Sequence, residues 1–195
     1  MQPQTFVFFG IVGSGKGTQV KLLTDFLKEK DGRDLVYIGT GEIFRQLMDL
    51  DNEDARFLGQ KMSEGELITD DFTNRSVSDA LKTKFSTEKH LIFDGYPRTV
   101  PQSVVFEDMM NSFKRGEVKI IYIEVGKEEA MKRNLLRGRH DDTEAGLAKR
   151  FDEYINNVVP AMNYFRNKNN YQIYTINGEQ SVENVHKEII SKLGY

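Results

Sequence analysis

The sequence predicts an α/β fold in which a five-stranded parallel sheet is covered by helices on both faces. Five short apolar runs, rich in β-branched and aromatic residues, are typical of buried strands. They alternate with longer segments whose apolar residues have helical spacing, and this alternation favours a parallel sheet between two helical layers. The 195 residues, 38% of them hydrophobic, suffice for a packed core. We therefore expect residues 1–195 to form a single domain.

The expected strands are the runs at residues 6–9, 35–38, 91–93, 120–125 and 172–176. The first intervening helix should open near Lys16. Thr99, followed by Pro101, is a helix-start signal, and Ser181 is the expected N-cap of the last helix. In sheets of this kind ligands bind beyond the carboxyl ends of the strands, so the segments that follow the strands are where a site is expected.

Composition and charge exclude several classes of protein. Thirty acidic side chains against 27 basic ones give a net charge of −3, which argues against a general nucleic-acid binder. The chain has no cysteine, so disulfides, thiolate zinc sites and thiol nucleophiles are excluded, and a reducing compartment is favoured. No apolar run approaches the roughly 20 residues needed to cross a bilayer. We expect a cytoplasmic protein that binds neither nucleic acid nor membrane.

The first expected strand leads into a glycine-rich loop, GIVGSGKGT, at residues 10–18. Glycines at this spacing let backbone N–H groups surround a phosphate, and the helix that follows adds the positive end of its dipole. This combination predicts a P-loop three-layer fold that binds ATP. Thr18 should offer a hydroxyl to a phosphate or to the magnesium shell, although the generic pattern has a hydroxyl residue directly after the lysine. The residues expected around the ATP phosphates are Gly13, Ser14, Gly15, Lys16, Gly17 and Thr18.

Polar residues also follow the second and third expected strands. Thr40 and Arg45 follow the second; taken alone, they could equally be a helix-capping threonine and a solvated arginine. Asp94, at the end of the third strand, suits a magnesium-bound water. Arg98 can hold a phosphate through two parallel hydrogen bonds, and Gln102, about one helical turn further, can read an adenine edge.

Four arginines lie close together after the fourth expected strand, at Arg133, Arg137, Arg139 and Arg150. A solvated basic helix face is the ordinary explanation of such spacing. Their position on the ligand side of the sheet favours a different explanation, that they act in phosphoryl transfer. Transfer of a γ-phosphoryl group needs positive charge spread around its equatorial oxygens.

Three motifs together resemble the nucleoside monophosphate kinases, and the adenylate kinases above all. They are GKGTQ at residues 15–19, GTGEIFR at residues 39–45 and DGYPRT at residues 94–99. The stretch GRHDD at residues 138–142 also fits the family pattern, and the resemblance runs from about residue 6 to residue 193.

The resemblance implies reversible phosphoryl transfer from Mg²⁺-ATP to AMP, giving two ADP, by a monomer that maintains adenine nucleotide balance. It implies that residues 39–69 form an inserted AMP-binding subdomain and that residues 137–140 are a vestigial lid. Lys16, Arg98 and the four clustered arginines would be catalytic, with Thr18 and Asp94 near Mg²⁺. On the ATP side it adds Arg133, Arg137 and Gln180. On the AMP side it implies Thr40, Arg45, Glu66, Leu67, Ile68, Gly95, Tyr96, Pro97, Arg98, Gln102, Arg139 and Arg150.

The sequence departs from the family at the lid, since only Gly138 separates Arg137 from Arg139. The cysteine-bearing zinc insert of many bacterial relatives is absent, so no zinc is expected. Within the class the alternative is a UMP/CMP-type kinase, but relatives of that type tend to carry alanine in place of Thr40 and asparagine in place of Thr99. The alternatives from other classes are a P-loop ATPase switch and a non-catalytic nucleotide-binding module.

Overall fold

The computed structural model describes residues 2–137 and 143–195, and for residue 137 it describes only the backbone. The strands are β1 (Thr5–Phe9), β2 (Leu35–Gly39), β3 (His90–Asp94), β4 (Val118–Glu124) and β5 (Tyr171–Asn177). The helices are α1 (Lys16–Asp31), α2 (Thr40–Met48), α3 (Glu53–Ser63), α4 (Asp70–Lys84), α5 (Val100–Ser112), α6 (Lys127–Arg137), α7 (Glu144–Glu153), α8 (Val159–Asn163) and α9 (Val182–Lys192). A π-helical turn, Tyr154–Val158, joins α7 to α8.

The strands form one sheet in the order β2-β3-β1-β4-β5, and every neighbouring pair is parallel. The predicted five-stranded parallel sheet is therefore confirmed. Because β1 lies in the middle of the sheet, the loop that follows it stands at the centre of the edge where ligands bind.

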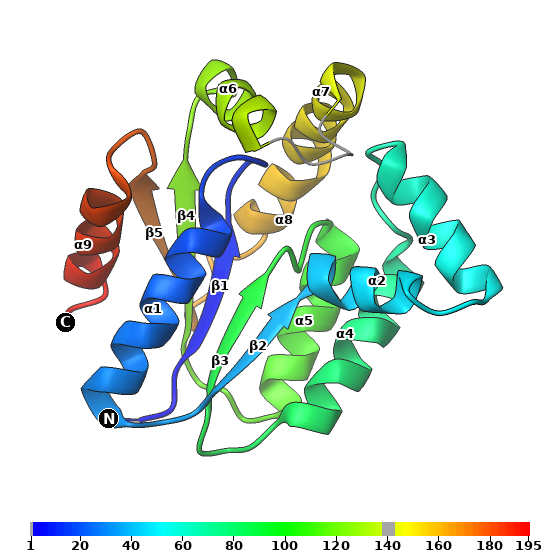
Figure 1. Cartoon of the computed structure of the whole chain (residues 1–195). Helices are drawn as coiled ribbons and strands as arrows, with labels where there is room; N and C mark the ends of the chain where they lie inside the picture. The colour runs from blue at the N-terminus through cyan, green and yellow to red at the C-terminus, as the bar shows by residue number, and fades with distance from the viewer. Residues whose placement is uncertain (1, 138–142) are drawn as a thin grey trace.

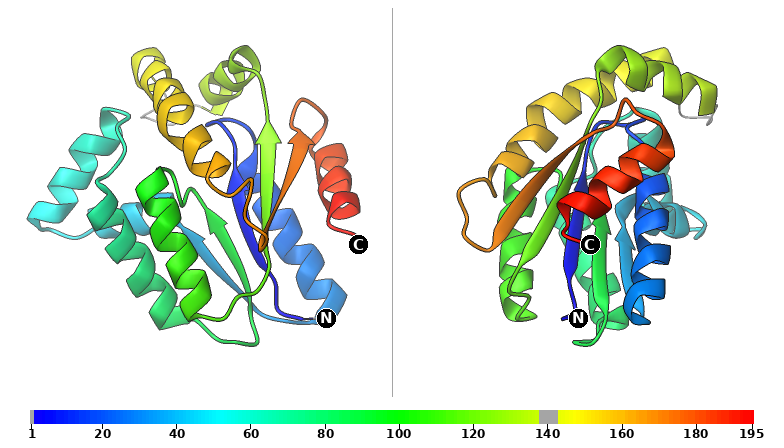
Figure 2. Two further views of the ribbon diagram at one scale, coloured as in Figure 1. Left: turned by 180° about the vertical axis from the view of Figure 1, so that it is seen from behind. Right: turned by 90° about the vertical axis from the view of Figure 1, so that its left-hand side faces the viewer.

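Helices cover both faces of the sheet, as the alternation of side chains along β1 illustrates. Val7 and Phe9 pack on one face with α4, α5 and α8, whereas Phe6 and Phe8 pack on the other with α1 and α9. Successive side chains of a strand point to opposite faces, so a central strand with apolar residues at every position needs both layers. Figure 1 shows α1 and α9 in front of the sheet, and the view from behind in Figure 2 shows α4, α5 and α8.

The strand boundaries differ from expectation by one or two residues. Four strands include the expected runs and extend them, for example at Thr5 and Asn177, because hydrogen-bonded pairing continues beyond the apolar residues. The expected run at 120–125 is shifted: β4 begins at Val118 and ends at Glu124. Lys119 interrupts the apolar pattern, so the first two paired residues of β4 were not recognised in the sequence. Val125 belongs to the connection between β4 and α6. The helix starts at Lys16, Thr99 and Ser181 are confirmed.

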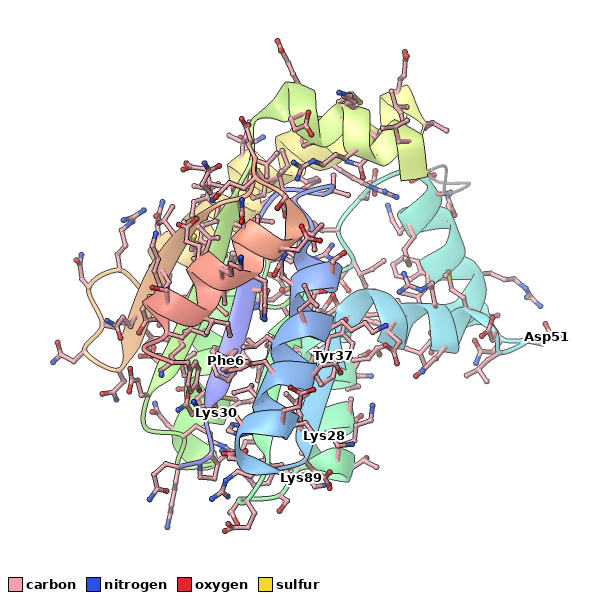
Figure 3. All side chains as sticks on the ribbon, turned by 60° about the vertical axis from the view of Figure 1, so that its left-hand side comes forward. Phe6, Lys28, Lys30, Tyr37, Asp51 and Lys89 are labelled. Carbon is pink, nitrogen blue, oxygen red and sulfur yellow. The ribbon has the colours of Figure 1, made fainter. Side chains whose placement is uncertain are left out.

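Two groups of helices stand at the carboxyl end of the sheet. Helices α2 and α3 extend to one side of it, and α6 and α7 lie across the top (Figure 1). Asp51, in the turn between α2 and α3, marks the outer tip of the first group (Figure 3). This group has a small apolar core of its own, formed by Phe44, Leu58 and Ile68. Within the described residues, no helix is long and apolar enough to cross a membrane.

Candidate active site

The phosphate loop joins β1 to α1 and is shaped by glycines. Gly13 and Gly15 have φ angles of 88° and 90°, in the left-handed region that side chains disfavour, and Gly15 is the N-cap of α1. The first turn of α1 carries no acidic residue, so the positive end of its dipole is not offset there. Lys16 donates from Nζ to the carbonyl oxygens of Gly10, at 2.8 Å, and Ile11, at 3.1 Å. The loop therefore has the shape of an anion-binding loop, and its lysine is hydrogen-bonded to the backbone of the loop itself.

Ser14 and Thr18 place two hydroxyl groups at this cradle. Ser14 is buried, and its Oγ has no hydrogen-bond partner within the described part of the chain. Thr18 lies in the first turn of α1 and is exposed. Since a buried hydroxyl without a partner costs free energy, the loop is suited to a ligand that supplies acceptor oxygens.

Asp94, at the end of β3, lies between the strand that leads into the phosphate loop and the strand that leads to Thr40. In the sheet it is paired with Phe8 of β1 on one side and with Gly39 of β2 on the other. Its Oδ2 accepts a hydrogen bond of 3.4 Å from the hydroxyl of Tyr37. Burial, helped by the nearby Asp94 charge, raises the pKa of Tyr37, so the hydroxyl stays protonated and acts as a donor. Tyr37 was not anticipated from the sequence.

Residues that follow β2 and β3 meet at the carbonyl of Gly95. Its oxygen accepts hydrogen bonds from Thr40 Oγ1 and from Arg98 Nε, each 2.8 Å long. Gly95 has a φ of 76°, and a Cβ there would come within 2.7 Å of both donor side chains. Burial lowers the pKa of Arg98; Asp94 opposes this shift and Arg150 adds to it. Thr40, Gly95 and Arg98 are thus brought together, with the charge of Arg150 near enough to act on Arg98.

The amide of Gln102 is held at both ends. Its Oε1 accepts from the backbone N–H of Arg98, and its Nε2 donates to Oδ1 of Asp70, each over 2.8 Å. The hydroxyl of Thr99 donates to the same Asp70 oxygen, also over 2.8 Å. Gln102 is only 1% exposed, so the structure shows its amide engaged within the protein. The part played by Asp70 was missed in the sequence, where it reads as an ordinary helix-start acid.

The peptide bond between Tyr96 and Pro97 is cis. The ring of Tyr96 is buried against Phe106, and its hydroxyl donates to Oδ1 of Asn74 over 2.7 Å. The Tyr96 side chain therefore faces the core, and of this residue only the backbone remains for the expected contact with AMP.

Besides Arg98, the expected arginines that the structure describes lie on three helices. Arg45 is exposed on α2. Arg133 on α6 bonds to Glu129 at 2.7 Å and to the carbonyl of Gly178, in the connection that contains Gln180, at 3.0 Å. Arg150 on α7 donates from Nη2 to the carbonyl of Met62 over 3.4 Å. Arg139 and the side chain of Arg137, and with them most of the expected lid at residues 137–140, lie outside the described residues.

The stretch from Glu66 to Ile68 joins α3 to α4. Ile68 is buried in the small core of this segment, and Leu67 is half-buried. Glu66 forms ion pairs with Lys61 and Lys149, and hydrogen bonds from Lys149 and then Lys61 lower the pKa of its carboxyl to about 2. Neither lysine was expected to take part.

The candidate site offers oxygen donors of the kind that magnesium prefers, at Thr18 and Asp94. In residues 2–137 and 143–195, no group of three or more His, Cys, Asp or Glu side chains could hold a metal. Asp94 and the Thr18 hydroxyl nevertheless fit an ion that brings phosphate oxygens and water as its other ligands, as Mg²⁺ does.

A family model described as adenylate kinase matches residues 8–170 of the chain. The chain belongs to the adenylate kinase family. It is 31% identical to the adenylate kinase of Thermosipho africanus, over 95% of this chain and 97% of that one. It is 31% identical to adenylate kinase 1 of a Nostoc species, over 96% and 97%, and 33% identical to the enzyme of Oenococcus oeni, over 92% and 93%. The resemblance drawn from the three motifs is thereby confirmed, and this adenylate kinase family member is an enzyme.

Proposed function

We propose that this enzyme transfers the terminal phosphoryl group of ATP to AMP, giving two ADP, between the loop after β1 and the segment after β3. The single observation that carries the proposal is the pairing of Asp94, the last residue of β3, with Phe8, the last residue but one of β1. It supports a donor site at the phosphate loop and an acceptor site at Thr40, Gly95 and Arg98, next to each other on one sheet edge.

On the donor side, Lys16 and the loop amides hold the ATP phosphates. Lys16 exchanges its hydrogen bonds with the carbonyls of Gly10 and Ile11 for contacts to the β- and γ-phosphates. The Ser14 hydroxyl, which has no hydrogen-bond partner among residues 2–137 and 143–195, supports this placement because an added phosphate oxygen would satisfy it. Arg133, tied to the connection after β5, and Gln180 in that connection border the ATP side.

On the acceptor side, Arg45 and Arg98 hold the phosphate of AMP. Residues 39–69 act as the AMP-binding subdomain, with the backbone of Glu66, Leu67 and Ile68 beside the base. Gln102 lies at the edge of the base and exchanges its hydrogen bond to Asp70 for one to the adenine. Arg137, Arg139 and Arg150 surround the transferring group. No general base is required, because a phosphate monoester has a second pKa of about 6 and is ionised at neutral pH. The protein's contribution is positioning and positive charge.

We propose Mg²⁺ as the cofactor, held through the nucleotide with Thr18 and Asp94. When bound, Mg²⁺ neutralises charge on the phosphates of ATP. Zinc is not expected, because the chain has no cysteine to supply thiolate ligands. Elemental analysis of the purified enzyme tests this, and one tightly held zinc per chain would contradict it.

We also propose that the enzyme is a cytoplasmic monomer that maintains adenine nucleotide balance and binds neither nucleic acid nor membrane. Its net charge of −3 and its lack of cysteine support this setting. Light scattering coupled to size-exclusion chromatography tests the monomer, and a stable dimer would contradict it.

A coupled assay over a panel of monophosphates, with ATP as the donor, tests the choice of acceptor. We expect kcat/KM for AMP to exceed that for CMP, UMP or GMP by at least about tenfold, or roughly 1.4 kcal/mol. Comparable use of UMP would overturn the assignment in favour of a broader monophosphate kinase. ATP hydrolysis without any acceptor would favour the ATPase switch instead.

A further inference from the structure

An ion pair joins the proposed acceptor segment, residues 39–69, to helix α7. Nζ of Lys149, on α7, lies 2.5 Å from Oε1 of Glu66, in the connection between α3 and α4. The other carboxylate oxygen, Oε2, lies 2.5 Å from Nζ of Lys61 on α3. Both pairs are partly exposed: the Glu66 side chain is 27% exposed and that of Lys149 is 42% exposed.

Two further contacts bring the same two parts of the chain together. A Cβ at Gly65 would lie 2.8 Å from the carbonyl oxygen of Gly146, which means that the two backbones approach closely. Arg150 donates to the carbonyl of Met62 over 3.4 Å. Figure 1 shows the same relationship, with the end of α3 and the start of α7 facing each other above the sheet.

The contact joins the part of the chain that is proposed to bind the AMP base to the helix that is proposed to act on the transferring phosphoryl group. Glu66 begins the stretch that lines the AMP base, and Lys149 directly precedes Arg150, which we place at the transferring phosphoryl group. A shift of the acceptor segment away from α7 would therefore separate the base site from Arg150. The Lys149–Glu66 pair opposes that shift, whereas the Lys61–Glu66 pair lies within the segment and would move with it.

We propose that Lys149 is a positioning residue of the acceptor site, whose ion pair with Glu66 seats the acceptor segment on α7 and so strengthens AMP binding. This inference rests on the proposed function. Lys149 does not touch the substrate; it acts through Glu66 and the backbone of residues 66–68. The buried apolar side chains of α7, Leu147 and Phe151, are separate from the pair, so the helix can keep its packing when Lys149 is changed.

Lys149→Met tests the proposal by keeping the aliphatic stem and removing the charge. Partly exposed ion pairs are modest in strength, so we expect KM for AMP to rise about two- to fivefold, with KM for ATP unchanged and kcat unchanged or higher. Lys61→Met is the matched control, because it removes a charge from the same carboxylate without touching the link to α7. It should leave KM for AMP near the wild-type value.

Reversal of the pair separates positioning from a general effect of charge. In a Lys61→Met background, Lys149→Glu should raise KM for AMP more than Lys149→Met does, because two carboxylates then face each other. Adding Glu66→Lys to that variant should restore most of the loss, which is the signature of a direct interaction. The difference between wild type and Lys149→Met should also shrink as NaCl is raised, since salt screens the pair.

These experiments distinguish failure of the inference about Lys149 from failure of the proposed function. If the wild type does not phosphorylate AMP, the proposed function is wrong. If it does, and Lys149→Met leaves KM for AMP unchanged, Lys149 is not a positioning residue. Equal effects of Lys61→Met and Lys149→Met, or no rescue by the reversed pair, would also overturn the inference.

Discussion

The side-chain amide of Asn134, on α6, donates a hydrogen bond to the backbone carbonyl of Val12 in the phosphate loop, over 3.0 Å. The same amide nitrogen lies 2.7 Å from the carbonyl of Ala130, and Asn134 is fully buried. Helix α6 carries Arg133 and ends at Arg137. The bond from Asn134 therefore attaches the helix that bears these arginines to the loop that is proposed to hold ATP. The bond therefore holds the proposed ATP site in a fixed position relative to Arg133.

Gly13 is required for this contact. It has a φ of 88°, and a Cβ there would lie 2.6 Å from the carbonyl oxygen of Ala130. Gly13→Ala should therefore lower the free energy of unfolding by about 1–3 kcal/mol, since both the backbone angle and the approach of α6 are strained. Urea unfolding measures this, with Gly15→Ala as the control, because Gly15 has a similar φ of 90° but a Cβ there meets nothing within 4 Å. Equal stability of the two variants would show that α6 does not press on the loop.

Lys16→Met should abolish most of the activity without unfolding the loop. The substitution keeps the stem and removes a charge that we expect to strengthen its contact as the phosphoryl group transfers. We expect kcat to fall by roughly 10²- to 10⁴-fold in a coupled assay. A single cooperative urea transition would show that the variant is folded. A variant with near-normal kcat and only a raised KM for ATP would contradict the catalytic role of Lys16.

The layers of the fold could be predicted because buried strands have a strong local signal. All-apolar runs such as that of β1 need a helix layer on each face, and the strand-helix alternation then gives a parallel sheet. The π-helical turn at Tyr154–Val158 carried no comparable signal, since its sequence continues the helical pattern on both sides.

Within the candidate site, the residues that follow strands could be predicted because the topology gathers them at one edge. Thr40, Gly95 and Arg98 are examples. Contacts between ordinary charged or polar residues could not be predicted. Lys149 and Glu66 are 83 positions apart, and no feature of the sequence indicates that their side chains form an ion pair. The same holds for Asn134, whose partner is a backbone carbonyl that only the packing of α6 brings close.

Tyr37→Phe should weaken the response to magnesium. The hydroxyl donates to Oδ2 of Asp94 over 3.4 Å, so its loss leaves the carboxylate less well oriented toward the magnesium-bound water that we propose as its partner. Because the hydrogen bond is long, we expect a rise of only about twofold in the Mg²⁺ concentration for half-maximal rate, with kcat unchanged at saturation.

Tyr174→Phe is the matched control for this measurement, because the Tyr174 hydroxyl bonds to Gln172 on β5, at the far edge of the sheet from β2. The control should show the wild-type magnesium response. An unchanged response in Tyr37→Phe, with Mg²⁺ titrated at fixed total ATP, would show that Tyr37 does not act on Asp94.

The last prediction concerns a buried histidine at the opposite end of the sheet from the phosphate loop. His90, on β3, is fully buried; its Nδ1 accepts from the backbone N–H of Gln4 over 3.0 Å, and its Nε2 lies 3.3 Å from the Asp31 carboxylate. The neutral ring therefore carries its proton on Nε2. Burial lowers the pKa of His90 below its ordinary value of 6.5; Asp31 opposes the shift, and the charges of Arg33 and Arg115 add to it.

Because the pKa of His90 is lower in the folded state, the unfolded chain takes up the proton first as the pH falls. The stability contributed by the neutral histidine is then complete above pH 6.5 and is lost progressively below it. Hydrogen bonds from the Arg33 backbone and from His90 outweigh burial and lower the pKa of Asp31, so its carboxylate stays ionised above pH 5 and does not add to the change. Burial also lowers the pKa of His186, so only a difference between variants isolates His90.

His90→Asn supplies that difference, because asparagine is polar but cannot be protonated. At pH 7.5 the variant should lose about 1–3 kcal/mol of unfolding free energy relative to wild type, through the hydrogen bonds to Gln4 and Asp31. Urea unfolding at intervals from pH 7.5 to pH 5 should show this gap narrowing below pH 6.5, since only the wild type is destabilised by proton uptake at His90. A gap that widens on acidification would mean that the pKa of His90 is raised in the folded enzyme by pairing with Asp31 as a cation, and a constant gap would mean that folding does not change the pKa of His90.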